Sequence, residues 1–153
     1  MIRYVLETCR RVDQAIEALS RIPVALSQNV TVLDRSCDYA TLFLGPHRSP
    51  IVSRVKACAN HQECAAAAAE SIERQQVALE ALDDPAMSLE GLTGCFLSPP
   101  LYSRQIRSPT VYTAVYQPAD GRVDYLWPGK SWCQRFDQFH PGEYTHDYGA
   151  LLH

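Results

Sequence analysis

Residues 63–83 constrain the fold more than any other segment because their composition strongly favours a long helix. They contain the alanine run Ala65–Ala69 and further strong helix formers up to Leu82. The sequence Asp83-Asp84-Pro85 that follows predicts the end of this helix. On both sides of it, short apolar segments are bounded by turn residues, as expected for strands. The chain is therefore predicted to place strands both before and after one long helix.

Before this helix, the sequence predicts a helical N-terminal segment and a small antiparallel sheet. Residues 2–20 carry a helical pattern with a break near Arg10 and Arg11. The polar stretch Asp34–Asp38 is predicted to form a turn between two strands. The strands expected in this region cover residues 24–33, 39–44 and 51–58.

After the long helix, the sequence predicts a second helix and a hairpin. The second helix covers residues 88–96, with Ser88 as its N-cap. The turn sequence Pro118–Gly121 joins strands predicted over residues 110–117 and 122–127. The segment from Pro128 onward is rich in aromatic residues, Gly and Pro, and is expected to wrap the surface. The order helix, strands, helices, strands predicts a single α+β domain over residues 1–153.

The composition excludes several classes of function. A net charge of −3 and a pI near 5.9 give no electrostatic basis for binding nucleic acid. No apolar run has the length of a membrane span, and the N-terminus lacks the apolar core of a secretory signal. The six cysteines form no CxxC pair and are expected to be reduced thiols in a cytoplasmic protein. No glycine-rich phosphate loop or paired-carboxylate motif is present, so no cofactor is predicted.

The most informative polar motif is Ala59-Asn60-His61-Gln62-Glu63, between the apolar segment 51–58 and the long helix. This position puts an amide and an imidazole at the end of a predicted strand, where catalytic side chains often lie. Asn60 is the first candidate for a site residue. The alternative is an asparagine that satisfies backbone groups of its own turn.

Several segments together carry a resemblance to a known family, and they occur in that family's order. They are Arg3-Tyr4-Val5-Leu6-Glu7, Asn29–Ser36, Ala59-Asn60-His61-Gln62, Thr110–Tyr116 and Trp127-Pro128-Gly129. Over nearly its whole length the chain resembles the penicillin acyltransferase-like hydrolases, which are related to the choloylglycine hydrolases. The motif around Asn60 is similar to the asparagine turn of this family.

The resemblance implies the N-terminal-nucleophile fold, an αββα sandwich of two antiparallel sheets between helical layers. It also implies cleavage or acyl transfer at linear, non-peptide C–N amide bonds. In such enzymes an N-terminal cysteine attacks the amide and its own α-amino group serves as base. That amine titrates at roughly 7.7–8.0 and can accept the thiol proton at neutral pH.

The nucleophile of this family lies upstream of the segment that resembles Arg3–Glu7. We therefore expect the chain to be the C-terminal portion of a longer enzyme and to be inactive alone. Its expected partner is the missing N-terminal segment or a second copy of the chain, and the intact enzyme would take a small-molecule amide or acyl substrate. Whether the chain by itself is an enzyme is a question that the sequence leaves open.

The resemblance implies roles for four residues. Asn60 would donate its amide to the oxyanion of the tetrahedral intermediate. His61 would orient Asn60 or line the substrate pocket, with a structural role as the alternative. Arg107 would supply the pocket charge and Arg104 would contact substrate, with a solvated arginine at a strand end as the alternative for both.

Two hypotheses of other classes stay open. Cys58, His61 and Cys64 follow the spacing C-x2-H-x2-C, and a zinc site would need a fourth ligand such as His140 or His146. Because the resemblance explains this turn without a metal, no metal site is predicted. The chain could instead be a non-catalytic remnant that acts as an interaction module.

The remaining polar and aromatic residues of the strands are interpreted as sheet residues. Asn29 and Thr31 are read as ordinary polar residues of the first strand. The aromatic residues expected to pack on the later strands are Tyr112, Tyr116, Tyr125, Trp127 and Trp132.

Overall fold

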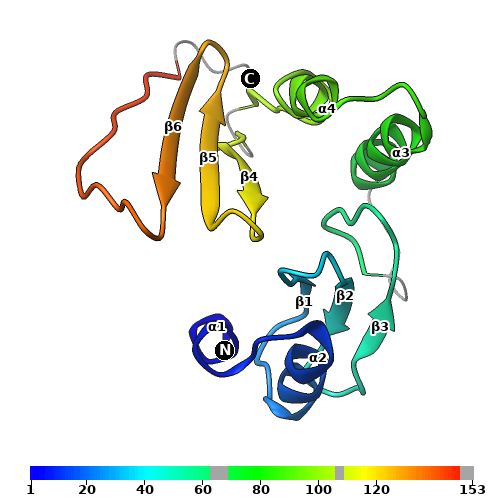
Figure 1. Ribbon diagram of the computed structural model, residues 1–153. Helices are drawn as coiled ribbons and strands as arrows, with labels where there is room; N and C mark the ends of the chain where they lie inside the picture. Colours follow the sequence, from blue (N-terminus) through cyan, green and yellow to red (C-terminus); the bar gives the residue numbers. More distant parts are fainter. Residues whose placement is uncertain (63–68, 106–108, 149–153) are drawn as a thin grey trace. The chain divides into compact units, whose positions relative to one another are not determined.

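The computed structural model describes residues 1–62, 69–105 and 109–148. The chain divides into two compact units, Met1–Gln75 and Gln76–His153. The described residues form four helices and two three-stranded antiparallel sheets, one sheet in each unit (Figure 1). This confirms the α+β class predicted from the order of the elements.

The first unit begins with two short helices, α1 (Ile2–Thr8) and α2 (Val12–Arg21). They are separated at the predicted break, because the side-chain oxygen of Gln14 accepts hydrogen bonds from the backbone N–H groups of Arg10 and Arg11. These bonds satisfy two donors at the start of α2 that have no partner within the helix.

The sheet of the first unit contains β1 (Gln28–Leu33), β2 (Tyr39–Leu44) and β3 (Ile51–Ser53) in that order. In the β1–β2 register Thr31 lies opposite Thr41, and their hydroxyl oxygens are 2.8 Å apart. Thr31 is therefore the ordinary cross-strand residue that the sequence indicated.

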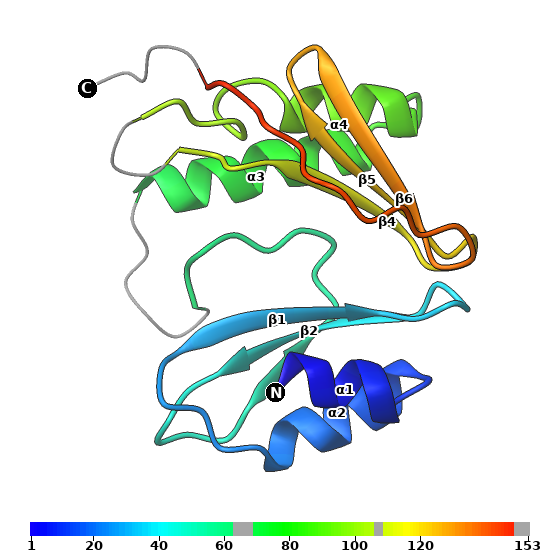
Figure 2. The same ribbon diagram turned by 90° about the vertical axis from the view of Figure 1, so that its left-hand side faces the viewer.

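Helices α1 and α2 cover one face of this sheet (Figure 2). The buried core between them contains Val5, Ala15, Leu19, Val30, Leu42 and Leu44. Because successive strand side chains point to opposite faces, the neighbours of Val30 on β1, Asn29 and Thr31, point to the face away from the helices.

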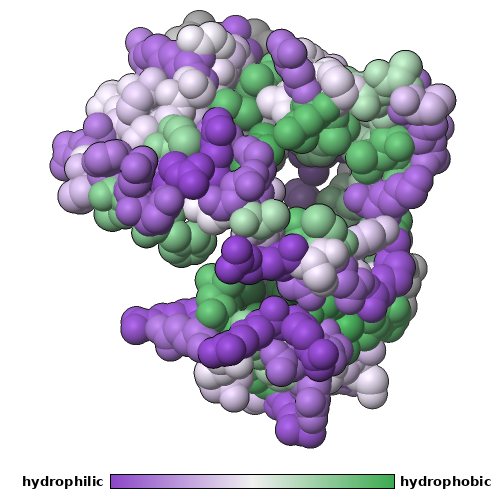
Figure 3. Space-filling view, viewed as in Figure 1, coloured by the Kyte–Doolittle hydropathy of each residue, from purple (hydrophilic) through white to green (hydrophobic). Residues whose placement is uncertain are grey.

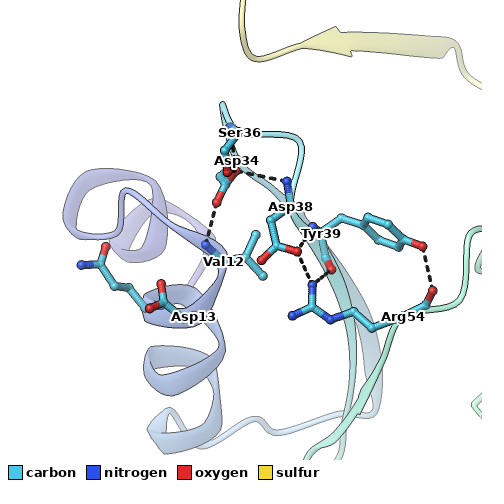
Figure 4. Close-up of polar contacts among 8 residues, drawn as sticks. Val12, Asp13, Asp34, Ser36, Asp38, Tyr39 and Arg54 are labelled. Atoms are coloured by element: carbon cyan, nitrogen blue, oxygen red, sulfur yellow. Dashed lines mark hydrogen bonds and ion pairs between the residues drawn. The ribbon is translucent and has the colours of Figure 1, made fainter.

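The turn after β1 is tied to the start of α2 by Asp34 (Figure 4). One carboxylate oxygen accepts the backbone N–H of Val12 at 3.1 Å. The other accepts the hydroxyl and backbone N–H of Ser36 and the backbone N–H of Asp38. These bonds, the Ser36 hydroxyl foremost, hold the pKa of Asp34 below its ordinary value.

The helix α3 (Ala69–Asp83) runs across the division between the units, and α4 (Leu89–Phe96) follows in the second unit. The hydroxyl of Ser88 accepts the backbone N–H of Gly91 at 3.0 Å, which confirms Ser88 as the N-cap of α4. Residues 63–68, where the long helix was expected to begin, lie outside the described residues.

The sheet of the second unit contains β4 (Thr113–Gln117), β5 (Arg122–Trp127) and β6 (Lys130–Arg135). Four of the five predicted aromatic side chains, those of Tyr112, Tyr125, Trp127 and Trp132, make ring contacts there, whereas Tyr116 is 61% exposed. The ring centroids of Tyr125 and Trp132 lie 5.9 Å apart, and Tyr144 from the following segment stacks on both Trp127 and Trp132.

Two expected strands of the first unit are shorter than predicted. Residues 24–27 form no strand, and the side chain of Leu26 is 76% exposed, so its apolar character does not reflect burial. The strand expected over 51–58 ends at Ser53, the last residue of β3 that pairs with β2.

The second unit departs from prediction at both ends of its sheet. Its first strand begins at Thr113 and not at residue 110. The segment from Pro128 onward, which was expected to wrap the surface, contains β6, and β6 pairs with β5 through the two-residue connection Pro128-Gly129. Gly129 adopts a φ of 75°, which this connection requires and which glycine adopts without strain.

Four of the described cysteines, Cys9, Cys37, Cys95 and Cys133, are free thiols. No helix in the described part of the chain is long and apolar enough to cross a membrane. The cytoplasmic location expected from the sequence stays a prediction.

Candidate functional site

The asparagine turn, Ala59–Gln62, does not lie at the end of a strand as the sequence suggested. The nearest strand, β3, ends at Ser53, and the chain continues without regular structure to the turn. The turn is held in place by side chains from β1 and α3.

Asn29 of β1 binds the turn through its side-chain amide. Its Nδ2 donates to the backbone carbonyls of Ala59 and His61, each at 2.8 Å, and lies 3.4 Å from the sulfur of Cys58. Its Oδ1 accepts a hydrogen bond of 2.6 Å from Nε2 of Gln62. Asn29 thus links one face of β1 to three residues of the turn.

Ser71 of α3 binds the same turn at other atoms. Its hydroxyl oxygen accepts the backbone N–H of Asn60 at 3.1 Å and lies 3.0 Å from Nδ1 of His61. The serine is buried, with 7% of its surface exposed, so these bonds satisfy a polar group that would otherwise lack a partner. Nε2 of Gln75, also on α3, donates a hydrogen bond to the backbone carbonyl of Ala57, two residues before the turn.

The side chain of Asn60 takes no part in this network. Its carboxamide makes no hydrogen bond to another described residue, although its backbone N–H does. The carbonyls of Ala59 and His61, which a turn asparagine could have satisfied, are bound by Asn29. Both the catalytic role expected for Asn60 and the alternative, in which it satisfies backbone groups of its own turn, stay predictions.

Asn60 opens onto a pocket of about 460 Å³ within the first unit. The residues that line it are Ser27, Gln28, Asn29, Thr31, Cys58, Ala59, Asn60 and Gln62. None of them is Asp, Glu, Lys, Arg or His, and three of them besides Asn60 carry side-chain amides. Such a lining can stabilise developing negative charge by hydrogen-bond donation without a fixed positive charge.

The other predicted site residues are not gathered around this pocket by the described structure. His61 is adjacent in sequence, but its ring faces Ser71 and its carbonyl faces Asn29, which is a structural use of the residue. Arg104 belongs to the second unit, where Nη2 donates to the carbonyl of Tyr148 at 3.3 Å. Arg107 lies outside the described residues. The roles expected for these three stay predictions.

The described residues contain no group of three or more His, Cys, Asp or Glu side chains placed to hold a metal ion. Cys64, one of the three ligands considered in the zinc hypothesis, lies outside the described residues. The thiol of Cys58 donates a hydrogen bond to the backbone carbonyl of Ala59, with a sulfur–oxygen distance of 3.3 Å.

These features define an α+β protein with a side-chain-braced asparagine turn beside a polar, uncharged pocket. Residues 1–132 match the family described as acyl-coenzyme A:6-aminopenicillanic acid acyl-transferase. Since the match covers most of the chain, the chain belongs to this family, as its resemblance indicated. No curated protein and no solved structure gives a significant match to it.

Sequence reasoning missed Asn29 and Ser71 as parts of this site. A signal for Asn29 was available, because asparagine is depleted in strands and a half-buried amide needs a hydrogen-bond partner. Ser71 gave no such signal, since a serine within a predicted helix commonly faces solvent or its own helix backbone.

Proposed function

We propose that Asn60 is an oxyanion-hole donor for thiol-dependent cleavage or acyl transfer at a linear, non-peptide amide. The observation that carries this proposal is the uncommitted carboxamide of Asn60 beside an uncharged polar pocket. Membership of the acyl-transferase family supports chemistry on acyl groups. In the proposed step, a cysteine thiolate adds to the amide carbonyl, and the carbonyl oxygen becomes the oxyanion that Asn60 Nδ2 stabilises.

Collapse of that tetrahedral intermediate breaks the C–N bond. The departing amine takes the proton that the α-amino group of the cysteine accepted from the thiol, and the acyl group stays on sulfur as a thioester. Water or a second amine then attacks the thioester, and a second oxyanion forms at the same position. One donor held in place therefore serves both steps.

The proposal assigns the attacking cysteine to a segment beyond the residues of this chain, and the partner is that segment or a second copy. Both units expose large apolar side chains. Leu6 is 78% exposed and Leu26 is 76% exposed in the first unit, and Phe136 is 96% exposed in the second. Hydrophobic residues are visible on the surface of each unit (Figure 3).

The test is to produce the chain together with the upstream segment that carries the cysteine, and to measure release of nitroaniline from an acyl nitroanilide. Asn60→Ala is expected to lower kcat by roughly 10²–10³-fold, about 2.7–4 kcal/mol of transition-state stabilisation, with little change in KM. The matched control is Gln76→Ala, which removes an exposed amide on α3 and should leave turnover unchanged.

Full turnover in the Asn60→Ala enzyme would remove Asn60 from the mechanism. A second outcome is that the chain associates with the upstream segment and yet gives no thiol-dependent turnover with any acyl anilide. In that case the non-catalytic interaction module becomes the better description.

A further inference from the structure

The carboxamide of Asn29 has a fixed orientation and uses its full donor capacity. Both carbonyl oxygens that it contacts can only accept, so the group 2.8 Å from each must be the NH₂ end. The oxygen end must then accept, and Nε2 of Gln62 donates to it at 2.6 Å. With the Asn29 amide reversed, its oxygen would face the carbonyl oxygens of Ala59 and His61, and neither contact could be a hydrogen bond.

This arrangement determines what the neighbouring asparagine can do. A carboxamide within a turn readily bonds nearby backbone carbonyls, and the carbonyls of Ala59 and His61 flank Asn60 directly. Asn29 donates to both of them at 2.8 Å, and among the described residues the Asn60 carboxamide makes no hydrogen bond to either. Ser71 meanwhile fixes the backbone N–H of Asn60.

We propose that Asn29 is a positioning residue that keeps the Asn60 carboxamide uncommitted and aimed into the pocket. The inference rests on the proposed function only for its catalytic consequence. Asn29 also lines the pocket, but its two donor hydrogens are used by the turn, so its effect on the reaction passes through Asn60.

The sequence allows a direct spectroscopic test, because Asn29 and Asn60 are its only asparagines. Selective ¹⁵N labelling of asparagine in the chain gives two pairs of side-chain NH₂ resonances, one pair from each asparagine. We expect one pair, from Asn29, to exchange with solvent about tenfold or more slowly than the other, as a lost net hydrogen bond of ordinary strength implies. Equally fast exchange of both pairs would overturn the proposal.

Asn29→Asp keeps the size of the side chain and the acceptor for Gln62, and removes both donor hydrogens. The single remaining NH₂ pair, from Asn60, should then shift and exchange more slowly as Asn60 takes over the freed carbonyls. Gln134→Glu is the matched control. It makes the same amide-to-acid change at a buried residue of the second unit whose amide donates to the carbonyl of His140, and both asparagine signals should stay in place.

An unchanged Asn60 signal in folded Asn29→Asp protein would overturn the proposal. Should that variant fail to fold, Gln62→Met supplies the second test, since it removes only the donor to Asn29 Oδ1. The Asn29 pair should then exchange faster than in the unaltered chain, and an unchanged rate would count against the network.

Turnover of the enzyme formed by the chain and its upstream segment distinguishes a positioning role of Asn29 from a purely structural one. Asn29→Asp is expected to lower kcat by roughly 10²-fold through misplacement of Asn60, with KM nearly unchanged. Asn29→His, which retains one ring N–H donor, should recover part of the loss. If Asn60→Ala is fully active while the two labelled signals behave as expected, the proposed function fails and the positioning by Asn29 stands.

Discussion

Asp34 connects the turn after β1 to the first turn of α2 through both of its carboxylate oxygens. Its contact with the backbone N–H of Val12 satisfies a donor at the start of α2 and places negative charge at the positive end of the helix dipole. Asp34→Asn should therefore lower the free energy of unfolding at neutral pH.

The pKa of Asp34 gives this prediction a pH dependence of defined sign. The hydroxyl of Ser36 and the backbone N–H groups of Val12, Ser36 and Asp38 lower the pKa in the folded chain below its ordinary value of 3.8. A lowered carboxyl pKa contributes stability that is present above the unfolded pKa and is lost as the pH falls through the folded pKa. Denaturant unfolding should show Asp34→Asn less stable at neutral pH, with the difference shrinking below pH 3.8.

Asp13→Asn is the control for the loss of one negative charge. Asp13 lies exposed in the first turn of the same helix, where its carboxylate pairs with Arg11 and accepts the backbone N–H of Gln14. It therefore matches Asp34 in charge and in position on the helix dipole but lacks the contact with the turn after β1. If the free energies of unfolding of Asp34→Asn and of the unaltered chain differ by the same amount at every pH, the effect does not come from the Asp34 carboxylate.

At the scale of single residues, the sequence pointed to Asn60 but not to the residues that hold it. Asn60 stands in a short polar motif, so its importance was visible locally. Asn29 acts across more than thirty positions of sequence, and its role depends on the face of β1 from which it projects. No local pattern encodes that contact, which exists only after β1 and the turn are brought together.

At the scale of single elements, the N-cap residue Ser88 allows a prediction for the stability of α4. Its hydroxyl accepts the backbone N–H of Gly91, so Ser88→Ala should cost about 0.5–2 kcal/mol of stability in α4. Amide exchange of the peptide covering residues 88–96 would measure the loss. Ser88→Asp should restore protection because aspartate caps as well as serine does, whereas Ser20→Ala on an exposed position of α2 should change little.

The elements that the sequence predicted correctly are those bounded by a recognisable helix cap or turn sequence. α4 has its cap at Ser88, and the β4–β5 hairpin has Asp120-Gly121 in its turn, with Gly121 at a φ of 59°. β6 was missed because its aromatic and polar residues lack a long apolar run. The dipeptide Pro128-Gly129, directly after a predicted strand, was the available signal for a second hairpin.

For the whole molecule, the order of segments was enough to predict the α+β class. The αββα sandwich implied by the family resemblance concerns how sheets and helical layers combine, and it stays a prediction. The two sheets are separate sets of hydrogen-bonded strands, so each unit can be tested through its own core.

The core of the first unit predicts the effect of one truncation. Leu19 is 1% exposed and packs between α2 and the sheet, so Leu19→Ala should cost about 2–5 kcal/mol. Faster amide exchange in β2 would report the loss. Leu26→Ala, at a leucine that is 76% exposed, is the matched control and should stay within about 0.5 kcal/mol of the unaltered chain. Equal effects of the two would contradict the core described for this unit.

Both tryptophans, Trp127 and Trp132, belong to the sheet of the second unit. Intrinsic tryptophan fluorescence of the chain is therefore a reporter for that unit alone. Denaturant unfolding followed by this emission therefore reports the melting of the second unit. The first unit contains no tryptophan, so its unfolding needs another probe, such as far-UV circular dichroism.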